Sequence, residues 1–577
     1  MKNDLTTVSH SLAHVMAQSV NRLYKEVKQG VGPAIENGFY QDFDIDKTIT
    51  PQDLPKIEAE MKKIISENLE FKKEIISKKE ALALYKNDPY KTELINEMND
   101  QKISIYKSGE YTDLCKGPHV KSTGELKNYA YKLNKLAGAY FRGDEKNKMM
   151  QRIYGIAFNN AKELRKHLLN LEEAKKRDHR KLGKELDLFV IDDNIGKGLP
   201  LIAPKGAIIR KAILDYEYQL EEEAGFEHVF CPHIARTEMY KKTGHWQHYK
   251  DVMYAPFGID GDDYVLKPMN CPHHYMIYAS KQRSYKDLPY RVAEPGTCYR
   301  YEKSGELSGL LRVRSLTIDD SHILMTEAQI ENEFKTCIKM IAKIFNAFQL
   351  KDYYVRLSLS DPLDTVKYIA DPKTWDKAGK KLEKIIKDNN LKYIKAKGEA
   401  SFYGPKIDYM VKDSIGREWQ MSTLQLDLFM GKRLNLTYKD ENGQEKNPVI
   451  LHRGLTGSIE RTLGILIEHF AGAFPLWLSP IQVKIIPVSD KFITTAQKIK
   501  DKFKENNIRC EIDNRTESVG KKIAENIKEK NPYAIVIGKK EAKSGKLAVR
   551  TRGKKNIEEI EIDKFIKKLE EEIKNKK

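Results

Sequence analysis

The stretch YRVAEPGTCYRYEKSGELSGLLRVRSLTIDDSHI, residues 290–323, decides the fold of the central part of the chain. Its segment Leu310–Thr317 is a β-type run, and Ser401–Val411 is another. Both lie in the longest block of the chain, about Glu185 to Pro480, which is rich in Tyr, Phe and Arg. Runs of this kind bounded by turn residues are typical of strands. We therefore expect an antiparallel sheet domain in this block.

Two arginines in the central block suit phosphate binding. Arg300 lies in GTCYRYE, residues 296–302, and Arg461 lies in GLTGSIERTLGILIEHF, residues 454–470. A planar guanidinium makes bidentate contacts and keeps its charge. The sequence has no GxxxxGKS/T loop and no GxGxxG turn. Any nucleotide binding must therefore use something other than a P-loop or a Rossmann turn.

Three further segments flank the central block. Ala161–Leu188 has no proline and is rich in Lys, Arg, Glu and Leu, which predicts a connecting helix. The N-terminal segment opens with a helical pattern at Ser9–Val27. Beyond Pro480, short β-type runs alternate with helical patterns near residues 494–506, 519–530 and 557–573. That alternation predicts a small α/β domain with a largely parallel sheet.

The composition is that of a multidomain globular protein. Of the 577 residues 40% are hydrophobic, and no apolar run reaches the ~18 residues of a spanning helix. The first residues lack a secretory pattern, so we expect a cytoplasmic protein without a membrane partner. Its six cysteines are scattered, which favours reduced thiols.

The net charge of the chain is +18, from 101 basic and 83 acidic residues. Residues 481–577 hold 26 Lys and Arg against 16 Asp and Glu, a net charge of +10. This concentration favours a nucleic-acid partner for the C-terminal segment. The alternative is a generally lysine-rich, solvated surface.

Two short N-terminal motifs gather histidine and cysteine. HSLAH places His10 and His14 on one face of the opening helix, and CKGPH adds Cys115 and His119. By ligand type these four side chains suit a zinc site. They equally suit a metal-free hydrolytic site in which a histidine activates water. The residues alone do not choose between the two.

The motifs of the chain resemble, in order and spacing, the threonyl-tRNA synthetase family of class II aminoacyl-tRNA synthetases. They include GHWQHY (residues 244–249), KPMNCPHH (267–274), DDSH (319–322), FYGPKID (402–408), WQMSTLQLD (419–427), LHRGLTGS (451–458), and the N-terminal HSLAH and DLCKGPH stretches. The resemblance covers essentially the whole chain. It implies a multidomain α+β protein of the bacterial type, lacking the small N-terminal domain that many relatives carry.

The resemblance also implies four segments and their tasks. Residues 1–160 would form an α+β editing domain, 161–188 a connecting helix, 189–480 the class II catalytic domain with its antiparallel sheet, and 481–577 an α/β anticodon-binding domain. The expected partners are ATP, L-threonine, tRNA(Thr) and a second copy of the chain in a homodimer.

In the catalytic domain the resemblance implies one Zn²⁺ bound by Cys271, His322 and His452, and Mg²⁺ bound with ATP. Zinc with an open position would hold the amino group and hydroxyl of threonine, which excludes valine. The other matching residues and their implied roles are Arg300 on the α-phosphate, Glu302 on adenine, Arg312 and Arg461 on the terminal phosphates, Asp320, Lys406, Gln420 and Gln425 in the substrate pocket, and His245 near the tRNA ribose.

Serine is a harder competitor than valine, since it lacks only a methyl group, a difference of about 1–3 kcal/mol. The family meets this with a second, hydrolytic site that resembles a metal-free hydrolase. The matching residues here are His10, His14, Lys91, Asp113, Cys115 and His119. For the anticodon, Glu541 and Arg550 match positions that contact bases. The sequence departs from common family residues at Gln41, Ile318, Thr516 and Ala524.

Overall fold

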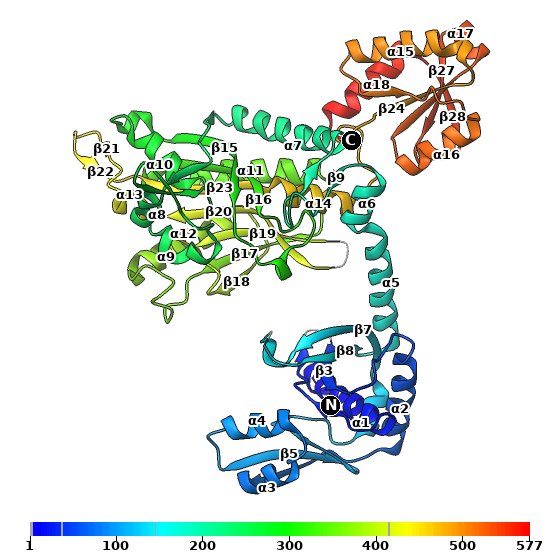
Figure 1. The fold of residues 1–577 in the computed structure, drawn as a ribbon. Helices are drawn as coiled ribbons and strands as arrows, with labels where there is room; N and C mark the ends of the chain where they lie inside the picture. The colour runs from blue at the N-terminus through cyan, green and yellow to red at the C-terminus, as the bar shows by residue number, and fades with distance from the viewer. Residues whose placement is uncertain (1–3, 36–37, 145, 414–415) are drawn as a thin grey trace. The chain divides into compact units, whose positions relative to one another are not determined.

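A computed structural model describes residues 4–35, 38–144, 146–413 and 416–577 (Figure 1). The chain divides into two compact units, Met1–Glu172 and Glu173–Lys577, and each is treated by itself. Among the described helices, none is both long and apolar enough to cross a membrane.

The first unit is built around helix α1 (Leu5–Leu23), whose residues from Val8 to Val20 are almost all buried. It packs on a sheet with strand order β1 (Lys28–Gln29), β3 (Gly38–Asp44), β8 (Met149–Phe158), β7 (Ala130–Tyr140), and β2 (Ala34–Ile35) pairs with β3. Helix α2 (Leu54–Glu67) closes the core. This packing fixes the face of α1 that carries His10 and His14.

A second, three-stranded sheet in the same unit consists of β4 (Lys72–Ser77), β5 (Lys102–Ser108) and β6 (Tyr111–Leu114). Helices α3 (Lys78–Leu84) and α4 (Pro89–Glu97) lie between β4 and β5 in the chain. Ser77 caps α3 with a capping box, and Asp88 caps α4. Strand β6 leads directly into Cys115.

The second unit holds the predicted antiparallel sheet. Its strand order is β11 (Glu227–His228), β15 (Tyr290–Tyr299), β16 (Ser315–Met325), β23 (Val449–Ser458), β20 (Glu418–Asp427), β19 (Lys406–Lys412), β17 (Tyr353–Leu359), β18 (Tyr393–Lys397). Only the outermost pairings, β11 with β15 and β17 with β18, are parallel among these strands. The central pairings are antiparallel, as predicted.

Alternation along β16 and β23 sends two sets of side chains to opposite faces of this sheet. Ile323 and Leu451 join the main core with helices α7 (Pro204–Glu223), α11 (Ile330–Ala347) and α14 (Ile459–His469). Leu324 and Ile450 instead pack with helix α10 (Cys271–Ala279). His322 and His452 therefore lie on the α10 face of the sheet.

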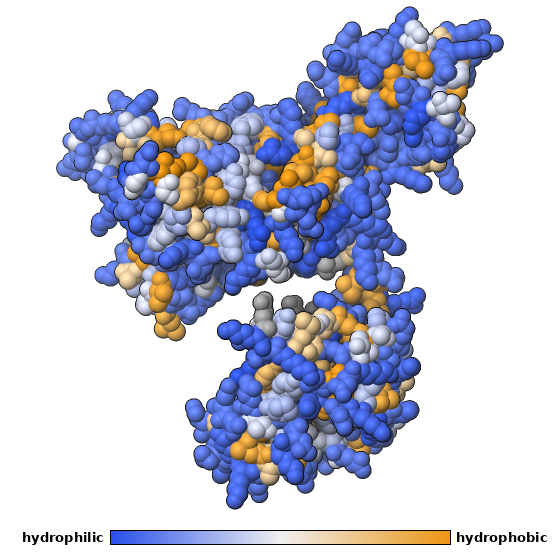
Figure 2. Space-filling model, viewed as in Figure 1, coloured by the Kyte–Doolittle hydropathy of each residue, from blue (hydrophilic) through white to orange (hydrophobic). Residues whose placement is uncertain are grey.

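The C-terminal part has a sheet of order β25 (Cys510–Ile512), β24 (Val483–Pro487), β26 (Tyr533–Ile537), β27 (Lys546–Thr551), β28 (Ile557–Glu561). Helices α15 (Ile493–Glu505), α16 (Val519–Glu529), α17 (Lys539–Ser544) and α18 (Ile562–Lys574) complete it. Its visible face is mainly hydrophilic (Figure 2).

Several sequence predictions of elements need correction. The C-terminal sheet is parallel at β24–β25 and β24–β26 but antiparallel at β26–β27 and β27–β28, so "largely parallel" was wrong. Residues 557–561, predicted as helix, form the last strand because β27 offers them an edge. The segment 161–188 holds two helices, α5 (Ala161–Arg177) and α6 (His179–Glu185). They separate at Asp178, whose side chain caps α6.

Candidate functional site

The α10 face of the large sheet brings together Cys271, His322 and His452, as the sequence resemblance predicted. His322 and His452 are direct neighbours in the β16–β23 register, and Cys271 begins α10. The His322 Nε2 and His452 Nδ1 atoms are 3.1 Å apart, and Cys271 Sγ lies 3.7 Å from His452 Nδ1. All three candidate ligand atoms lie within 4.8 Å of one another and all three residues are buried.

The donor set fits zinc. One sulfur and two imidazole nitrogens leave a tetrahedral position open, as in catalytic zinc sites. Burial raises the pKa of the Cys271 thiol well above its ordinary value and lowers that of His322 well below. A buried thiol without a cation stays protonated, whereas a bound divalent ion favours the thiolate. The His322 imidazole is already in the neutral form that a metal requires.

Each histidine of this set is held by a partner behind it. Asp427 Oδ2 lies 3.2 Å from His452 Nε2, so the Nδ1 atom is left for a ligand. His274 Nδ1 lies 2.7 Å from His322 Nδ1, and His274 Nε2 lies 3.3 Å from Glu294 Oε2. Burial raises the pKa of Glu294, but hydrogen bonds from His274 and the Cys231 N–H outweigh it and lower that pKa to about 2. This carboxylate therefore accepts from His274.

Beside these three residues lies a cluster of arginines. Glu302 pairs with Arg312, whose Nη2 atom is 2.7 Å from Glu302 Oε2. Arg461 Nε donates to the Leu311 carbonyl at 3.0 Å, and Arg300 Nε faces the Pro268 carbonyl at 3.4 Å. Burial, followed by repulsion from Arg300 and Arg312, lowers the pKa of Arg461 to about 10. Arginines gathered against their own repulsion indicate a site for a polyanion.

The remaining predicted pocket residues border the same face. Asp320 Oδ2 accepts from Asn270 at 2.9 Å, and Lys406 Nζ lies 3.3 Å from Asp408 Oδ2. Gln425 Oε1 accepts from the Tyr403 hydroxyl at 2.7 Å. Gln420 lies on β20 opposite Met410, at an irregularity in the register.

His245 is buried, and its environment keeps it neutral. Its Nδ1 atom lies 2.7 Å from Thr243 Oγ1, while its Nε2 atom has no hydrogen-bond partner among the described residues. Burial lowers its pKa to about 3. With Nδ1–H directed to Thr243, the Nε2 lone pair is an acceptor for a substrate proton.

In the first unit the structure gathers His10, His14, Cys115 and His119, with ligand atoms within 4.8 Å of one another. Cys115 Sγ lies 3.3 Å from His10 Nε2 and 3.3 Å from His119 Nε2. Burial lowers the pKa of His10, that of His14 to about 4 and that of His119 to about 2. The imidazoles are therefore neutral, which suits both metal binding and proton acceptance.

Lys91 and Asp113 lie beside this cluster as a buried ion pair. Lys91 Nζ is 2.6 Å from Asp113 Oδ1, and both side chains are only 5–6% exposed. His14 Nε2 lies 3.7 Å from Asp113 Oδ2. Burial raises the pKa of Cys115 to about 11, so the thiol is protonated near neutral pH. A nucleophilic thiolate is thus disfavoured, and an imidazole is the better candidate for activating water.

The two C-terminal candidates occupy different elements. Glu541 lies on α17 and its carboxylate accepts from the Gly538 N–H at 2.9 Å, which caps that helix. Arg550 lies on β27 opposite Ala534 and Ile557.

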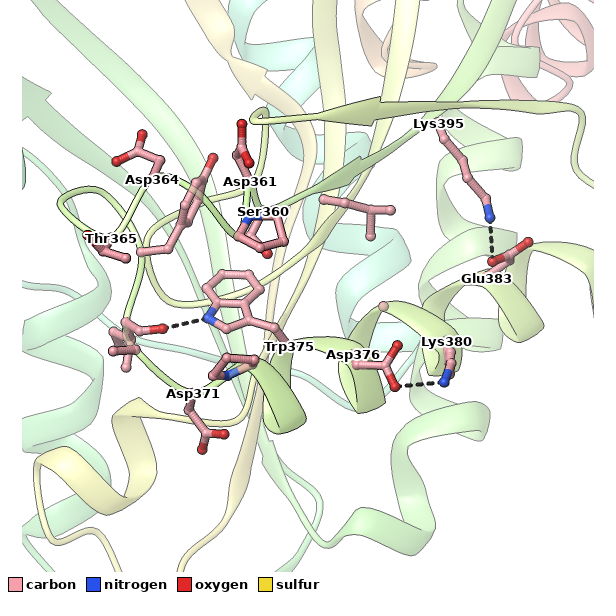
Figure 3. A pocket seen from close by; sticks show the side chains of 17 residues that line it. Ser360, Asp361, Asp364, Thr365, Asp371, Trp375, Asp376, Lys380, Glu383 and Lys395 are labelled. Carbon is pink, nitrogen blue, oxygen red and sulfur yellow. Dashed lines mark hydrogen bonds and ion pairs between the residues drawn. The ribbon is translucent and has the colours of Figure 1, made fainter.

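A cavity of about 440 Å³ between β17, the segment after it and α12 (Pro372–Asp388) lies apart from these residues (Figure 3). Its carboxylates have internal partners: Asp376 pairs with Lys380, Glu383 pairs with Lys395, and Asp371 caps α12. The Trp375 indole donates to the Ile369 carbonyl. Two of the carboxylates that line the cavity therefore already have a cationic partner within it.

Comparisons with known proteins agree with this arrangement. Residues 257–470 match the tRNA synthetase class II core domain (G, H, P, S and T), residues 482–572 an anticodon binding domain, and residues 103–154 the threonyl and alanyl tRNA synthetase second additional domain. A threonine–tRNA ligase of Halalkalibacterium halodurans is 48% identical over 99% of this chain and 89% of that protein. The chain belongs to the threonyl-tRNA synthetase family.

Other relatives support the same assignment. Threonine–tRNA ligase 1 of Bacillus subtilis is 47% identical over 99% of this chain and 89% of its own length. A solved structure from Cryptosporidium parvum, titled as the RNA binding domain of a threonyl-tRNA synthetase, is 32% identical with a TM-score of 0.65 and covers 68% of this chain and 98% of its own. The family joins threonine to tRNA, and its second additional domain is associated with editing.

Sequence reasoning missed the residues behind the candidate ligands. His274 lies one helical turn after Cys271, a spacing that places both on one face of α10 and was readable in KPMNCPHH. Glu294 and Asp427 come from other strands, and only the strand register reveals them.

Proposed function

We propose that this chain joins L-threonine to tRNA(Thr) in two steps with ATP and Mg²⁺, and hydrolyses mischarged seryl-tRNA(Thr) at a second site. The observation that carries the proposal is the convergence of Cys271, His322 and His452, together with an arginine cluster whose Arg300 directly follows β15 of the same sheet. In this view Cys271, His322 and His452 hold one Zn²⁺, which supplies a Lewis acid for the amino group and hydroxyl of threonine.

In the first step a threonine carboxylate oxygen attacks the α-phosphorus of ATP. The new O–P bond replaces the bond to the β-phosphate, and pyrophosphate leaves. Arg300 neutralises charge on the α-phosphate, and Arg312 and Arg461 do so on the terminal phosphates. Glu302 contacts adenine, and Asp320 accepts from the threonine hydroxyl. Catalysis is then mainly positioning and charge stabilisation.

The pocket around threonine is completed by Lys406, Gln420 and Gln425. In the second step a terminal ribose hydroxyl of the tRNA attacks the adenylate carbonyl, and AMP leaves. The neutral His245 Nε2 atom, which has no partner among the described residues, accepts the hydroxyl proton.

For the editing site we favour metal-free hydrolysis. A neutral imidazole of His10, His14 or His119 accepts a proton from water, which attacks the seryl ester carbonyl. The ester C–O bond to the ribose then breaks, the ribose oxygen takes the proton back, and serine and tRNA(Thr) leave. The Lys91–Asp113 ion pair keeps the charges next to His14 balanced. Cys115, in its protonated thiol form, holds the substrate. The C-terminal part, residues 481–577 with a net charge of +10, would bind the anticodon arm through Glu541 and Arg550.

We further propose the segment limits 1–160, 161–188, 189–480 and 481–577, a cytoplasmic location, and a homodimer. The deciding experiment is ATP–pyrophosphate exchange with threonine, valine and serine, followed by zinc analysis of the protein. Threonine should support exchange, valine should not, and serine should do so weakly. Absence of threonine-dependent exchange would refute the proposal.

A further inference from the structure

One buried histidine outside the residues discussed so far lies behind the arginine cluster. His179 is the first residue of α6 and is 2% exposed. It follows helix α5 by two residues and belongs to the second unit. Its imidazole lies between two segments that are far apart in sequence, the loop at Leu310 and the end of α14.

Two hydrogen bonds define the state of this imidazole. The backbone N–H of Leu310 donates to His179 Nε2 at 3.1 Å. The Nδ1 atom lies 2.8 Å from Glu468 Oε1. A backbone N–H can only donate, so Nε2 must be the acceptor and Nδ1 must carry the proton that Glu468 receives. Only the neutral Nδ1–H tautomer makes both bonds.

The loop held by His179 is packed closely against it. Gly309 has φ +53°, and a Cβ there would lie 2.1 Å from His179 Nε2. The neighbouring Leu311 carbonyl accepts from Arg461 Nε at 3.0 Å. One residue further, Arg312 pairs with Glu302. Leu310, whose N–H donates to His179, is therefore the direct neighbour of Leu311, whose carbonyl orients Arg461.

Helix α14 carries the residues that contact both His179 and the loop at Leu310. Arg461, Gly464 and Glu468 are spaced by three and four residues, so they share one face of the helix. Gly464 lets the loop approach, since a Cβ there would meet Leu310 Cβ at 3.2 Å. The same face of α14 thus bonds His179 at one end and the loop at the other.

We propose that His179 is a positioning residue for ATP activation. It holds the Leu310–Leu311 backbone on α14, so that the Leu311 carbonyl fixes the direction of the Arg461 guanidinium. The inference rests on the proposed function, in which Arg461 contacts the phosphates of ATP. Threonine binds at the Cys271 side, so His179 should affect ATP and leave threonine binding nearly unchanged.

Two substitutions each keep one of the two hydrogen bonds of His179 and remove the other. In His179→Asn the short amide keeps a donor for Glu468 but has no acceptor that reaches Leu310. In His179→Gln the longer amide places an oxygen near the Nε2 position and keeps the Leu310 bond. ATP–pyrophosphate exchange of the full chain is measured against ATP at saturating threonine and against threonine at saturating ATP. Thermal unfolding is followed for both variants.

The expected result is an ATP KM raised about tenfold in H179N, equivalent to about 1.4 kcal/mol, with the threonine KM within about twofold of the unsubstituted chain. H179Q should restore the ATP KM. The inference is overturned if H179N leaves the ATP KM unchanged, or if H179N and H179Q are impaired equally. Failure of the unsubstituted chain to show exchange would instead refute the proposed function.

The tautomer of His179 can also be measured directly, without an activity assay. NMR of the chain with isotopically labelled histidine reports the tautomer of each imidazole, and the signal missing from H179Q identifies His179. A neutral Nδ1–H form is expected near neutral pH. An Nε2–H form would exclude acceptance from Leu310 and overturn the inference even if H179N does not fold.

Discussion

Substituting Lys91 by methionine should destabilise the first unit strongly. Lys91 Nζ lies 2.6 Å from Asp113 Oδ1, and both side chains are 5–6% exposed. Methionine keeps much of the side-chain volume but leaves the Asp113 carboxylate buried without its cation. The Tyr111 hydroxyl and the Leu114 N–H still donate to that carboxylate. Breaking a buried pair in this way costs about 3–5 kcal/mol.

The double variant Lys91→Met, Asp113→Asn should recover most of that loss, because it removes the stranded charge as well as its partner. Replacing both members of a buried pair is often close to neutral. We expect a coupling energy of about 2–3 kcal/mol between the two positions, the upper part of the range for contacting residues. A neutral amide at position 113 accepts more weakly than a carboxylate from the Leu114 N–H, which accounts for the remaining loss.

Hydrogen exchange of the full chain, read by mass spectrometry, is the suitable assay because each unit can open separately. Peptides from α4 and β6 report the first unit, and peptides from α11 in the second unit are the internal control. A stabilising Lys91–Asp113 pair is excluded if the free energy of opening of the first unit in the single variant lies within about 1 kcal/mol of that in the unsubstituted chain, a fraction of the cost of a broken buried pair. The pair is equally excluded if the effects of the two substitutions on that free energy are additive.

The pH dependence gives the same pair a second test. Burial raises the pKa of Asp113, but Lys91 and His14 outweigh it and leave that pKa below its ordinary value. Its contribution to stability is therefore present above the unfolded pKa of about 3.9 and lost as the pH falls below it. Lys91→Met removes the largest interaction that opposes burial, so the pKa of Asp113 should rise and that variant should gain stability on acidification. The difference in stability of the first unit between the unsubstituted chain and Lys91→Met should therefore become smaller as the pH falls from 7 to 4.

Further predictions concern the two sites. Cys271→Ala should lose bound zinc, measured by elemental analysis, together with threonine-dependent exchange; retention of both would exclude Cys271 as a ligand. Arg461→Lys should lower exchange by about 100-fold, since lysine lacks the bidentate fork and oriented charge; a loss below threefold would contradict a phosphate contact. Cys115→Ser should leave threonine charging intact while seryl-tRNA accumulates in a serine-charging assay. Because burial lowers the pKa of His10, seryl-tRNA hydrolysis should stay constant as the pH falls from 8 to 6.5; a steep loss across that range would exclude a neutral His10 base.

Motifs in the sequence predicted the family, the central antiparallel sheet and the members of both clusters. They did so because each motif keeps local residue types, such as HSLAH on one face of α1. The convergence of Cys271 with His322 and His452 was not derivable from spacing. It depends on the β16–β23 register and on α10 crossing the same face, which are long-range features.

The errors have the same physical origin. Residues 557–561 match a helical spacing in Ile557 and Ile560, yet they pair with β27 in register from Arg550 to Lys546. Tertiary pairing overrides a weak local preference in such short segments. Likewise, the predicted strand at Leu310–Thr317 begins only at Ser315, because Leu310 and Leu311 belong to the loop held by His179 and Arg461.

Burial acts differently on the histidines and on Arg461 of the candidate site, and this difference matches the separate tasks proposed for them. It removes the proton from imidazoles, so that His322 and His245 present lone pairs near neutral pH. It also lowers the pKa of Arg461, but only to about 10, so the guanidinium remains charged. A lysine at the same place starts from a lower ordinary pKa and would move toward neutrality under the same burial. The same burial therefore leaves Arg461 charged for the phosphates, and His322 neutral for the metal ion, of the proposed function.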